Sequence, residues 1–361
     1  MFSQLSQSGT ARIPGLDGLR ALSVSFVIIE HLTQSGSVHL DLGWIGLGNL
    51  GVRIFFVISG FIVTTLLMEE RKKYGSISLK AFYIRRAFRI LPIWSCYVGV
   101  ILLGLALTHR FPPARDLWGV FTFNADYVPI STVDLAHLWS LSVEEKFYLI
   151  WPAALVFAGT RRSTGVAWIV VFTLPFVRLF DTMNGISFGA ASYLTFHHNA
   201  DALAVGCLLA LLRPQFEANR LFKRFLALPF APGWILLLVV GIAATQQLGL
   251  LWWVFGGITI LNLTIAVCVL VVIQDTRSVV DQVFQSAPVR RLGVWSYGIY
   301  LWQQPLTFHR KTGWLGVFPL NVIVLFFIAG IGYHLIEKRA QQFGRSIARP
   351  AQAHETAPAN S

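Results

Sequence analysis

Residues 225–274 read FLALPFAPGWILLLVVGIAATQQLGLLWWVFGGITILNLTIAVCVLVVIQ, fifty residues without a single Asp, Glu, Lys or Arg. As one helix, with a rise of about 1.5 Å per residue, this run would extend roughly 75 Å. The hydrocarbon core of a bilayer is only about 30 Å thick. The run is therefore predicted to fold back on itself inside a membrane, with the turn at the polar residues 245–249, TQQLG.

The whole chain shares this apolar character. Its 361 residues are 55% hydrophobic and only 13% charged, with a mean hydropathy of +0.62, whereas soluble domains carry about 25% charged residues. These values exclude an ordinary soluble protein and a disordered chain, which needs low hydrophobicity. The net charge of +12 is explained by membrane topology, so no nucleic-acid partner is expected. The three cysteines lie in apolar stretches without the spacing of a disulfide framework or zinc site.

Apolar runs between charge clusters predict an all-α, polytopic membrane protein with about ten transmembrane helices. The predicted spans are residues 19–32, 44–68, 91–108, 137–157, 166–177, 200–212, 230–244, 250–273, 292–307 and 317–336. They form one transmembrane domain, residues 12–340, between a polar N-terminal tail at 1–11 and a polar, disordered C-terminal tail at 341–361.

Basic residues set the predicted orientation, because Lys and Arg concentrate on cytoplasmic loops. With both termini inside, 22 of the 29 basic residues fall on the cytoplasmic side. Two more, Arg53 and Lys146, lie within predicted spans. The remaining five are placed on the outer side: Arg110, Arg115, Arg178, Arg310 and Lys311. The sequence therefore predicts an N-in, C-in topology.

Ionisable residues inside the first span are candidates for function, because burying charge in a membrane is costly. Arg20 and His31 are eleven residues apart, which is about 20° past three full helical turns, so they share one face and are separated by roughly 16 Å. The alternative is a purely structural pair, with Arg20 anchoring to lipid phosphate and His31 bonded to a neighbouring helix. Spacing alone leaves both interpretations open.

Several motifs, in chain order, resemble those of the family-3 membrane acyltransferases. They are GLDGLRAL at 15–22, GVRIFFVISGF at 51–61, FYIRRAFRILP at 82–92, HLWSLSVEEKFY at 137–148 and LGVWSYGIYLWQQPL at 292–306. The resemblance covers about residues 12–340. Two positions depart from the family pattern, because Gln303 stands where many relatives carry a histidine and Arg53 where they often carry Asp.

The resemblance implies an O-acyltransferase that moves an acyl group, most often acetyl, from cytosolic acetyl-coenzyme A (acyl-coenzyme A) to a hydroxyl. The implied acceptor is a surface or secreted glycan, such as an exopolysaccharide, or a glycolipid. The implied location is the bacterial plasma (inner) membrane, with membrane lipids and polysaccharide-assembly proteins as further partners. The form expected is one without a fused hydrolase-like domain.

The chemistry and the motifs together suggest roles for particular residues. An alcohol attacking a thioester needs a base that titrates near neutral pH, and His31 is the candidate, acting either as base or as an acylated relay. Glu145 or Glu144 is predicted to orient its imidazole, as in a catalytic triad. The alternative for these carboxylates is an internal ion pair with Lys146 that fixes helix packing.

Donor and acceptor contacts are predicted at other motif positions. Guanidinium groups suit the phosphates of coenzyme A, and helical spacing places Arg85, Arg86 and Arg89 on one face that would join Arg20 in a cytoplasmic dock. The alternative for this cluster is anionic lipid. The resemblance implies substrate contacts at Asp17, Trp139, Ser142, Tyr148 and Tyr297.

Two further patterns are interpreted as structural. The sequence GLGNLG at 46–51 fits a dinucleotide fingerprint, but no strand precedes it, so close helix packing or a tight loop is expected. His197 and His198, with Asp201 nearby, resemble metal ligands. Adjacent histidines point different ways on a helix and no third ligand is evident, so no metal is expected.

Two other functions would use the same buried polar residues. One is a transporter or flippase for glycans or glycolipids, although paired inverted repeats, which are typical of transporters, are not found in the sequence. The other is a lipid-binding subunit of a polysaccharide export system. Acetyl transfer by the purified protein would distinguish the enzyme from both.

Overall fold

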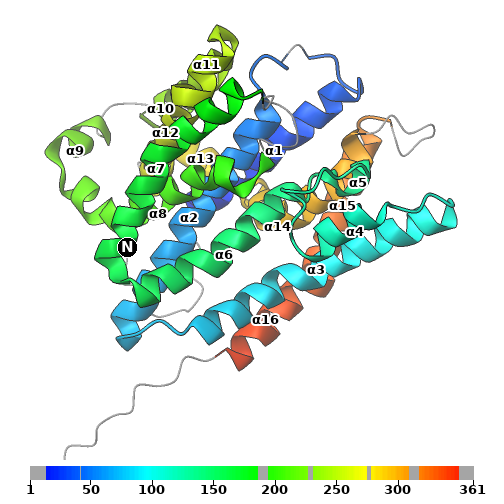
Figure 1. The fold of residues 1–361 in the computed structure, drawn as a ribbon, viewed down its shortest axis with the longest axis horizontal. Coiled ribbons are helices and arrows are strands. Elements are labelled where there is room, and N and C mark those ends of the chain that lie inside the picture. The colour runs from blue at the N-terminus through cyan, green and yellow to red at the C-terminus, as the bar shows by residue number, and fades with distance from the viewer. Residues whose placement is uncertain are drawn as a thin grey trace, which may run out of the picture.

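The computed structural model describes residues 14–40, 42–185, 194–226, 231–274, 278–308 and 317–348. Over these ranges the chain is helical and contains no strand, and the long helices form one bundle (Figure 1). The helices are α1 (Pro14–Gln34), α2 (Leu47–Tyr74), α3 (Leu79–Leu107), α4 (Ala114–Phe121), α5 (Val133–Ala136), α6 (Trp139–Phe157), α7 (Gly159–Met183), α8 (Phe196–Ala218), α9 (Arg220–Leu226), α10 (Ala231–Ala244), α11 (Leu250–Trp252), α12 (Ile258–Val272), α13 (Val279–Gln285), α14 (Ala287–Gln303), α15 (Leu320–Gly332) and α16 (Lys338–Ile347). Short π-helical segments join α11 to α12 and α15 to α16, and a third, Gln304–Phe308, extends α14.

The uncharged run folds back as its length requires. The helix α10 ends at Ala244, a 3-10 turn occupies Thr245–Leu248, and α11 begins at Leu250. Gly249, between them, has a φ of 136°, a backbone conformation that glycine adopts without strain. The predicted turn at residues 245–249 is therefore confirmed.

The helices have the lengths and surfaces of membrane spans. Five are long and apolar enough to cross a bilayer: Leu47–Tyr74, Leu79–Leu107, Gly159–Met183, Leu250–Val272 and Leu320–Ile347. Large side chains such as Leu103, Phe172 and Phe327 are more than half exposed on their outer faces, as lipid-facing residues are. The chain is thus an all-α, multi-pass membrane protein. Over the described residues, each predicted span overlaps a helix or two helices joined by a π-helical segment, and the total of ten crossings stays a prediction.

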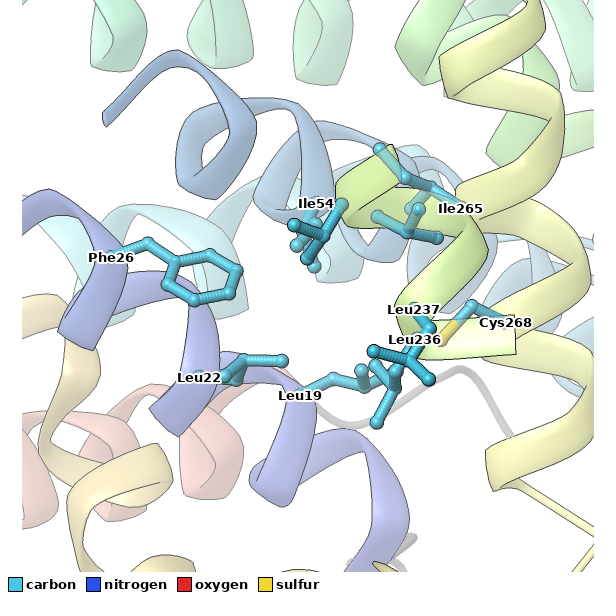
Figure 2. Close-up of a pocket in the computed structure, with 10 residues that line it drawn as sticks. Leu19, Leu22, Phe26, Ile54, Leu236, Leu237, Ile265 and Cys268 are labelled. Carbon is cyan, nitrogen blue, oxygen red and sulfur yellow. The ribbon is translucent and has the colours of Figure 1, made fainter. Parts of the chain in front are cut away.

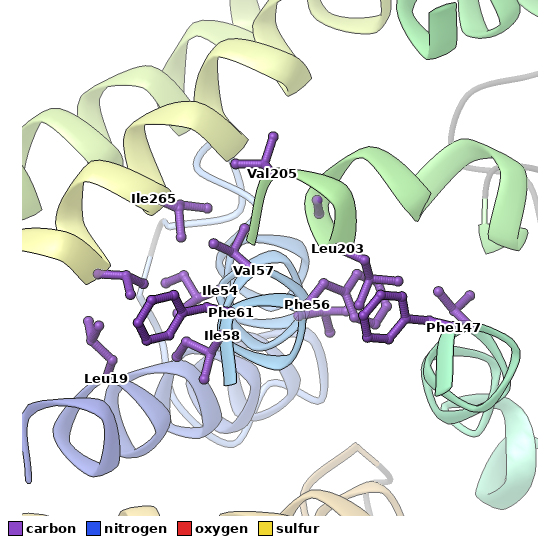
Figure 3. Packing of buried hydrophobic residues seen from close by; sticks show 14 of the residues in the cluster. Leu19, Ile54, Phe56, Val57, Ile58, Phe61, Phe147, Leu203, Val205 and Ile265 are labelled. Atoms are coloured by element: carbon purple, nitrogen blue, oxygen red, sulfur yellow. The ribbon is translucent and has the colours of Figure 1, made fainter. Parts of the chain in front are cut away.

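The helix α2 is the centre of the core. Phe56, Val57 and Phe61 are fully buried, and Figure 3 shows them directed toward neighbouring helices on several sides of α2. The helices α2 and α8 meet closely, because a Cβ atom at Gly60 would overlap the carbonyl oxygen of Leu203. Small residues allow such close packing of membrane helices.

The glycine pattern at residues 46–51 serves the same purpose. Gly46 starts α2 with a φ of 65°, which a glycine adopts readily. A Cβ at Gly51 would overlap the carbonyl oxygen of Ser23 in α1. The structural interpretation of this pattern, a tight turn followed by close helix packing, is confirmed.

The predicted C-terminal tail is corrected at its start. Residues 341–347 continue α16, which lies alongside α3 in Figure 1. The ring of Phe343 meets that of Phe88 with centroids 5.3 Å apart, so an apolar face holds this segment as helix. Residues 349–361 and the predicted N-terminal tail lie outside the described residues, as do Arg310 and Lys311.

The predicted topology can be checked with reporter fusions. A reporter inserted after Tyr74, between α2 and α3, is expected to read cytoplasmic, because the basic residues concentrate on that side. A reporter inserted at Gly249 is expected to read external. Paired alkaline phosphatase and green fluorescent protein fusions at both positions measure this. Reversed signals at the two positions would overturn the N-in assignment and the cytoplasmic placement of the arginines.

Candidate functional site

A polar cavity of about 140 Å³ surrounds His31 near the C-terminal end of α1. We call it the His31 pocket. It lies between α1, the start of α2, the start of α6 and the end of α14. Its lining residues are Val27, Glu30, His31, Gln34, Gly48, Asn49, Val52, His137, Trp139, Tyr300 and Gln303.

A single close contact orients the His31 ring. Its Nδ1 lies 2.5 Å from Oε1 of Gln303, and the side chain of Gln303 is in turn fully buried and adjacent to the Thr307 hydroxyl, at 3.4 Å. An amide oxygen only accepts hydrogen bonds, so His31 donates its Nδ1–H. The Nε2 atom of the ring therefore carries the lone pair and is the basic position.

Glu144 and Glu145 do not make this contact with His31. The Ser59 hydroxyl donates a 2.5 Å hydrogen bond to Glu144, while Glu145 interacts electrostatically with Arg86. The physical reason is depth, because these residues lie five and six positions beyond Trp139, about 8 Å further along α6. The predicted triad-like pairing of His31 with either carboxylate is therefore corrected to a pairing with Gln303.

The alternative ion pair within α6 is also wrong. Nζ of Lys146 lies 2.6 Å from Oδ1 of Asp126 and donates a second bond to the Phe123 carbonyl. Both acceptors belong to the loop between α4 and α5. Lys146 therefore ties α6 to this loop, and Glu144 and Glu145 are left for other partners.

Three of the predicted donor-binding arginines come together. Arg20, Arg86 and Arg89 are near enough to interact electrostatically, and we call them the arginine cluster. The guanidinium of Arg86 lies 3.5 Å from the centre of the Tyr148 ring, and Nη1 of Arg20 lies 3.5 Å from Asp17. The cluster thus joins α1, α3 and α6.

Arg85 lies apart from the arginine cluster. Its guanidinium pairs with Glu70 of α2 at 2.7 Å and donates to the Ala348 carbonyl at 3.4 Å. Successive helical residues differ by about 100° in direction, so Arg85 reaches Glu70 of α2 while Arg86 reaches Tyr148 of α6. The predicted single face of Arg85, Arg86 and Arg89 is corrected accordingly.

Four of the five predicted substrate residues divide between the two sites. Trp139 lines the His31 pocket, whereas Asp17, Tyr148 and Tyr297 lie at the arginine cluster. The hydroxyl of Tyr297 donates to the Ile90 carbonyl at 3.3 Å. Ser142 belongs to neither, because it is buried and accepts a bond from the Ala125 amide while donating to the Leu138 carbonyl.

Sequence reasoning missed two residues of the His31 pocket, His137 and Tyr300. The His137 ring lies edge-on to Tyr300, with centroids 5.5 Å apart, and the Tyr300 hydroxyl donates to the His137 carbonyl at 3.0 Å. Both belong to quoted motifs. His137 opens the fourth motif, and Tyr300 follows Tyr297 by three residues on one helix. The three-residue spacing that puts Tyr297 and Tyr300 on one helical face was the sequence signal for Tyr300.

The sequence position of Arg178 predicts that it lies on the outer side of the membrane, but the structure places it within a helix. It is fully buried in α7 and pairs with Asp201 of α8 at 2.9 Å. It also donates to the Val254 and His198 carbonyls and to Thr259. The helix α7 runs to Met183, six residues beyond the predicted span, and this places Arg178 inside the bundle.

Arg53 has a structural role, because its guanidinium interacts with side chains close to Asp201. Its guanidinium is 3.4 Å from the amide oxygen of Asn199 and 3.5 Å from that of Asn262. It also interacts electrostatically with Asp201. Arg53 therefore ties α2 to α8 and α12, and it does not line the His31 pocket.

A second cavity, of about 160 Å³, is shown in Figure 2. It lies between α1, α2, α10 and α12, and its lining includes Leu22, Phe26, Leu236 and Cys268. Only apolar side chains and one thiol line it. It offers no acid, base or phosphate-binding group, so this cavity is not a candidate for acyl-transfer chemistry.

Comparison with known proteins matches residues 13–336 to a family model described as an acyltransferase domain. YrhL of Bacillus subtilis, named as a candidate peptidoglycan O-acetyltransferase, is 32% identical over 95% of this chain and 57% of its own length. The O-acetyltransferase OatA of Staphylococcus aureus is 27% identical over 95% of this chain and 60% of its own length.

The chain thus spans less than two thirds of the length of these relatives. No solved structure matches it. The family match covers most of the chain, including the His31 pocket, the arginine cluster and all the quoted motifs. The chain therefore belongs to the family of membrane proteins that carry this acyltransferase domain.

Proposed function

We propose that the protein is a membrane O-acetyltransferase of the bacterial plasma membrane. It moves an acetyl group from cytosolic acetyl-coenzyme A to a hydroxyl of a cell-envelope glycan or glycolipid. The observation that carries this proposal is the placement of two polar sites on α1. The arginine cluster includes Arg20, and the His31 pocket lies eleven residues, or roughly 16 Å, further along the same helix.

The arginine cluster is the proposed dock for the phosphates of coenzyme A. Planar guanidinium groups match phosphate geometry, and the stacking of Arg86 on Tyr148 turns its charge into the bundle. A surface that binds anionic lipid would instead present its charges outward along the helix. The inward direction of the Arg86 guanidinium therefore favours coenzyme A over anionic lipid as the ligand.

Glu144 lies within electrostatic range of residues at both sites. Glu144 interacts electrostatically with Arg20 and Tyr148 at one end and with Tyr300 at the other. Tyr300 lines the His31 pocket. An extended pantetheine arm is comparable in length to the roughly 16 Å between Arg20 and His31. The coenzyme would therefore stay at the arginine cluster while its thioester reaches the histidine.

The proposed reaction centres on Nε2 of His31. In direct transfer, His31 takes the proton of the acceptor hydroxyl as the alkoxide attacks the thioester carbonyl. A C–O bond forms, the C–S bond breaks, and the proton passes to the departing thiolate. In the relay, Nε2 attacks the thioester carbonyl, a C–N bond forms and the C–S bond breaks with release of the thiolate. The acceptor hydroxyl then attacks the acetyl carbonyl, a C–O bond forms, the C–N bond breaks, and the hydroxyl proton passes to the thiolate. Both routes need Nε2 free, as the Gln303 contact leaves it.

The acceptor would enter the His31 pocket from the outer side of the membrane. Trp139 in that pocket offers an aromatic face for a sugar ring. The name of YrhL refers to peptidoglycan, which makes the hydroxyls of a peptidoglycan sugar the first acceptor to test. Other surface glycans present the same hydroxyl chemistry.

The proposed function can be tested in two steps. Purified protein in liposomes should transfer acetyl from acetyl-coenzyme A to an added glycan acceptor, with release of the free thiol. Mass spectrometry of envelope glycans from strains with and without the gene should then differ by one acetyl group. Acceptor movement across the liposome membrane without thioester cleavage would instead identify a transporter.

Donor binding provides a specific prediction. Arg86→Ala should weaken acetyl-coenzyme A binding about 10- to 150-fold, because a lost charge-assisted hydrogen bond costs about 1.5–3 kcal/mol. Arg71→Ala is the matched control, because Arg71 is an exposed arginine at the same end of the bundle, bonded to Thr160. Calorimetric titration of both variants measures the effect. If both variants bind acetyl-coenzyme A equally well, the arginine cluster would be assigned to lipid binding instead.

A further inference from the structure

Three potential metal ligands meet where α7 and α8 approach each other. Asp181 lies near the end of α7, and His197 and His198 occupy the first turn of α8. One donor atom from each lies within 4.8 Å of the other two. The expectation that His197 and His198 lack a third ligand is therefore wrong. The two rings lie with centroids 4.2 Å apart, next to the Asp181 carboxylate.

The ring nitrogens on the far side of each histidine are already occupied. Nδ1 of His197 lies 3.0 Å from the Tyr127 hydroxyl, and Nδ1 of His198 lies 2.9 Å from the Thr195 hydroxyl. Metal-binding histidines characteristically have their second nitrogen held in this way, which fixes the tautomer and the ring direction. The Nε2 atoms of both rings thus face the space beside Asp181, and that of His197 also lies 3.4 Å from the Thr195 hydroxyl.

The distances suit a small divalent cation. Oδ2 of Asp181 lies 2.8 Å from Nε2 of His198 and 4.0 Å from Nε2 of His197. Ligands of a tetrahedral zinc ion, bound at about 2.0–2.1 Å, are separated by about 3.3 Å. Each observed distance differs from that value by less than about 1 Å. Two imidazoles and one carboxylate are also a ligand set that zinc accepts.

We propose that Asp181, His197 and His198 form a zinc site, with water as the fourth ligand. The His197 side chain is 43% exposed and that of Asp181 18%, so solvent and the ion can reach the site. The site is distinct from the His31 pocket, because none of its ligands lines that cavity.

The role of the ion would be structural. It would join the end of α7 to the start of α8, beside the buried Arg178–Asp201 pair, since Arg178 donates to the His198 carbonyl at 3.1 Å. It would also hold the neighbouring loop, because the Phe196 amide donates to Asp126, at 3.0 Å, and Asp126 pairs with Lys146 of α6. Bound zinc should therefore stabilise this side of the bundle.

The test uses the full chain, purified with an affinity tag that contains no histidine and freed of metal with a chelator. Titration with Co²⁺ should give the strong visible absorption of a tetrahedral site, saturating at about one ion per chain. Added Zn²⁺ should abolish that absorption and raise the unfolding temperature of the protein in detergent. Absence of stoichiometric binding would show that the three residues form only a hydrogen-bonded cluster and would overturn the proposal.

Matched variants identify the ligands. His197→Gln should lose the Co²⁺ absorption, and because the His197 side chain is 43% exposed, this variant should keep the fold. Tyr127→Phe, which removes only the hydroxyl that holds His197, should weaken the ion about 10- to 100-fold. His39→Gln, at an exposed histidine outside the cluster, should bind as the unmodified protein does. Unchanged binding in His197→Gln would also overturn the proposal.

Discussion

Replacing His31 with glutamine is expected to abolish acetyl transfer while leaving acetyl-coenzyme A binding nearly intact. Glutamine keeps hydrogen-bonding capacity but can neither take a proton nor carry an acyl group, and general acid–base catalysis contributes about 10²–10⁴-fold to rate. The arginine cluster, by contrast, lies roughly 16 Å away. Turnover with acetyl-coenzyme A and a glycan acceptor, measured beside donor affinity by calorimetry, separates the two effects.

The control for His31→Gln is His39→Gln, the same change at an exposed histidine outside the His31 pocket. It should keep normal turnover in membranes that contain equal amounts of protein. Near-normal turnover in His31→Gln would make His31 a structural residue. The base would then be sought first at His137, which lines the same cavity, and next at the Glu144 and Glu145 pair.

Replacing Arg178 with methionine is expected to destabilise the fold by about 3–5 kcal/mol, because removing one partner of a buried ion pair leaves the other charge uncompensated. Asp201 would be that charge, fully buried in α8. The carbonyls of Val254 and His198 would also lose their donor. Resistance to denaturant in detergent micelles, followed by intrinsic tryptophan fluorescence, measures the loss.

Arg115→Met is the matched control for this stability prediction. Arg115 also pairs with an aspartate, Asp116, at 3.6 Å, but its side chain is 62% exposed. The buried Asp116 carboxylate also accepts hydrogen bonds from Ser131 and Thr132, so it keeps partners without Arg115. An ion pair made by an exposed arginine contributes at most about 1 kcal/mol, so this variant should unfold close to the unmodified protein. Equal stability of the two variants would mean that the Arg178–Asp201 pair does not hold α7 against α8.

The membrane environment explains why so much of the fold could be predicted. Backbone groups in a bilayer must be satisfied within the segment, so apolar runs become helices, and the turn after Ala244 follows from the length of its uncharged run. The ends of the membrane spans were predicted less accurately. The helix α7 continues past the predicted span because Arg178, a strong stop signal by composition, is neutralised by Asp201 from another helix.

Part of the candidate site could also be predicted from the sequence. The shared face of Arg20 and His31 follows from the period of a single helix, and motif order identified the family. The partner that each side chain finds on another segment could not be predicted from the spacing within one helix. The alternative interpretation paired Lys146 with Glu144 or Glu145, but its partner is Asp126, which a loop brings within 2.6 Å.

The sequence by itself determined that this protein is a bundle of membrane helices, that Arg20 and His31 share one face of α1, and the family to which the chain belongs. These properties depend on composition and on periodicity within one segment. Only the tertiary structure decided that Gln303 orients His31 across 272 residues of chain, that Arg85 leaves the arginine cluster, and that Asp181 meets His197 and His198. Such contacts depend on the depth and rotation at which helices pack, and helical spacing along one segment fixes neither.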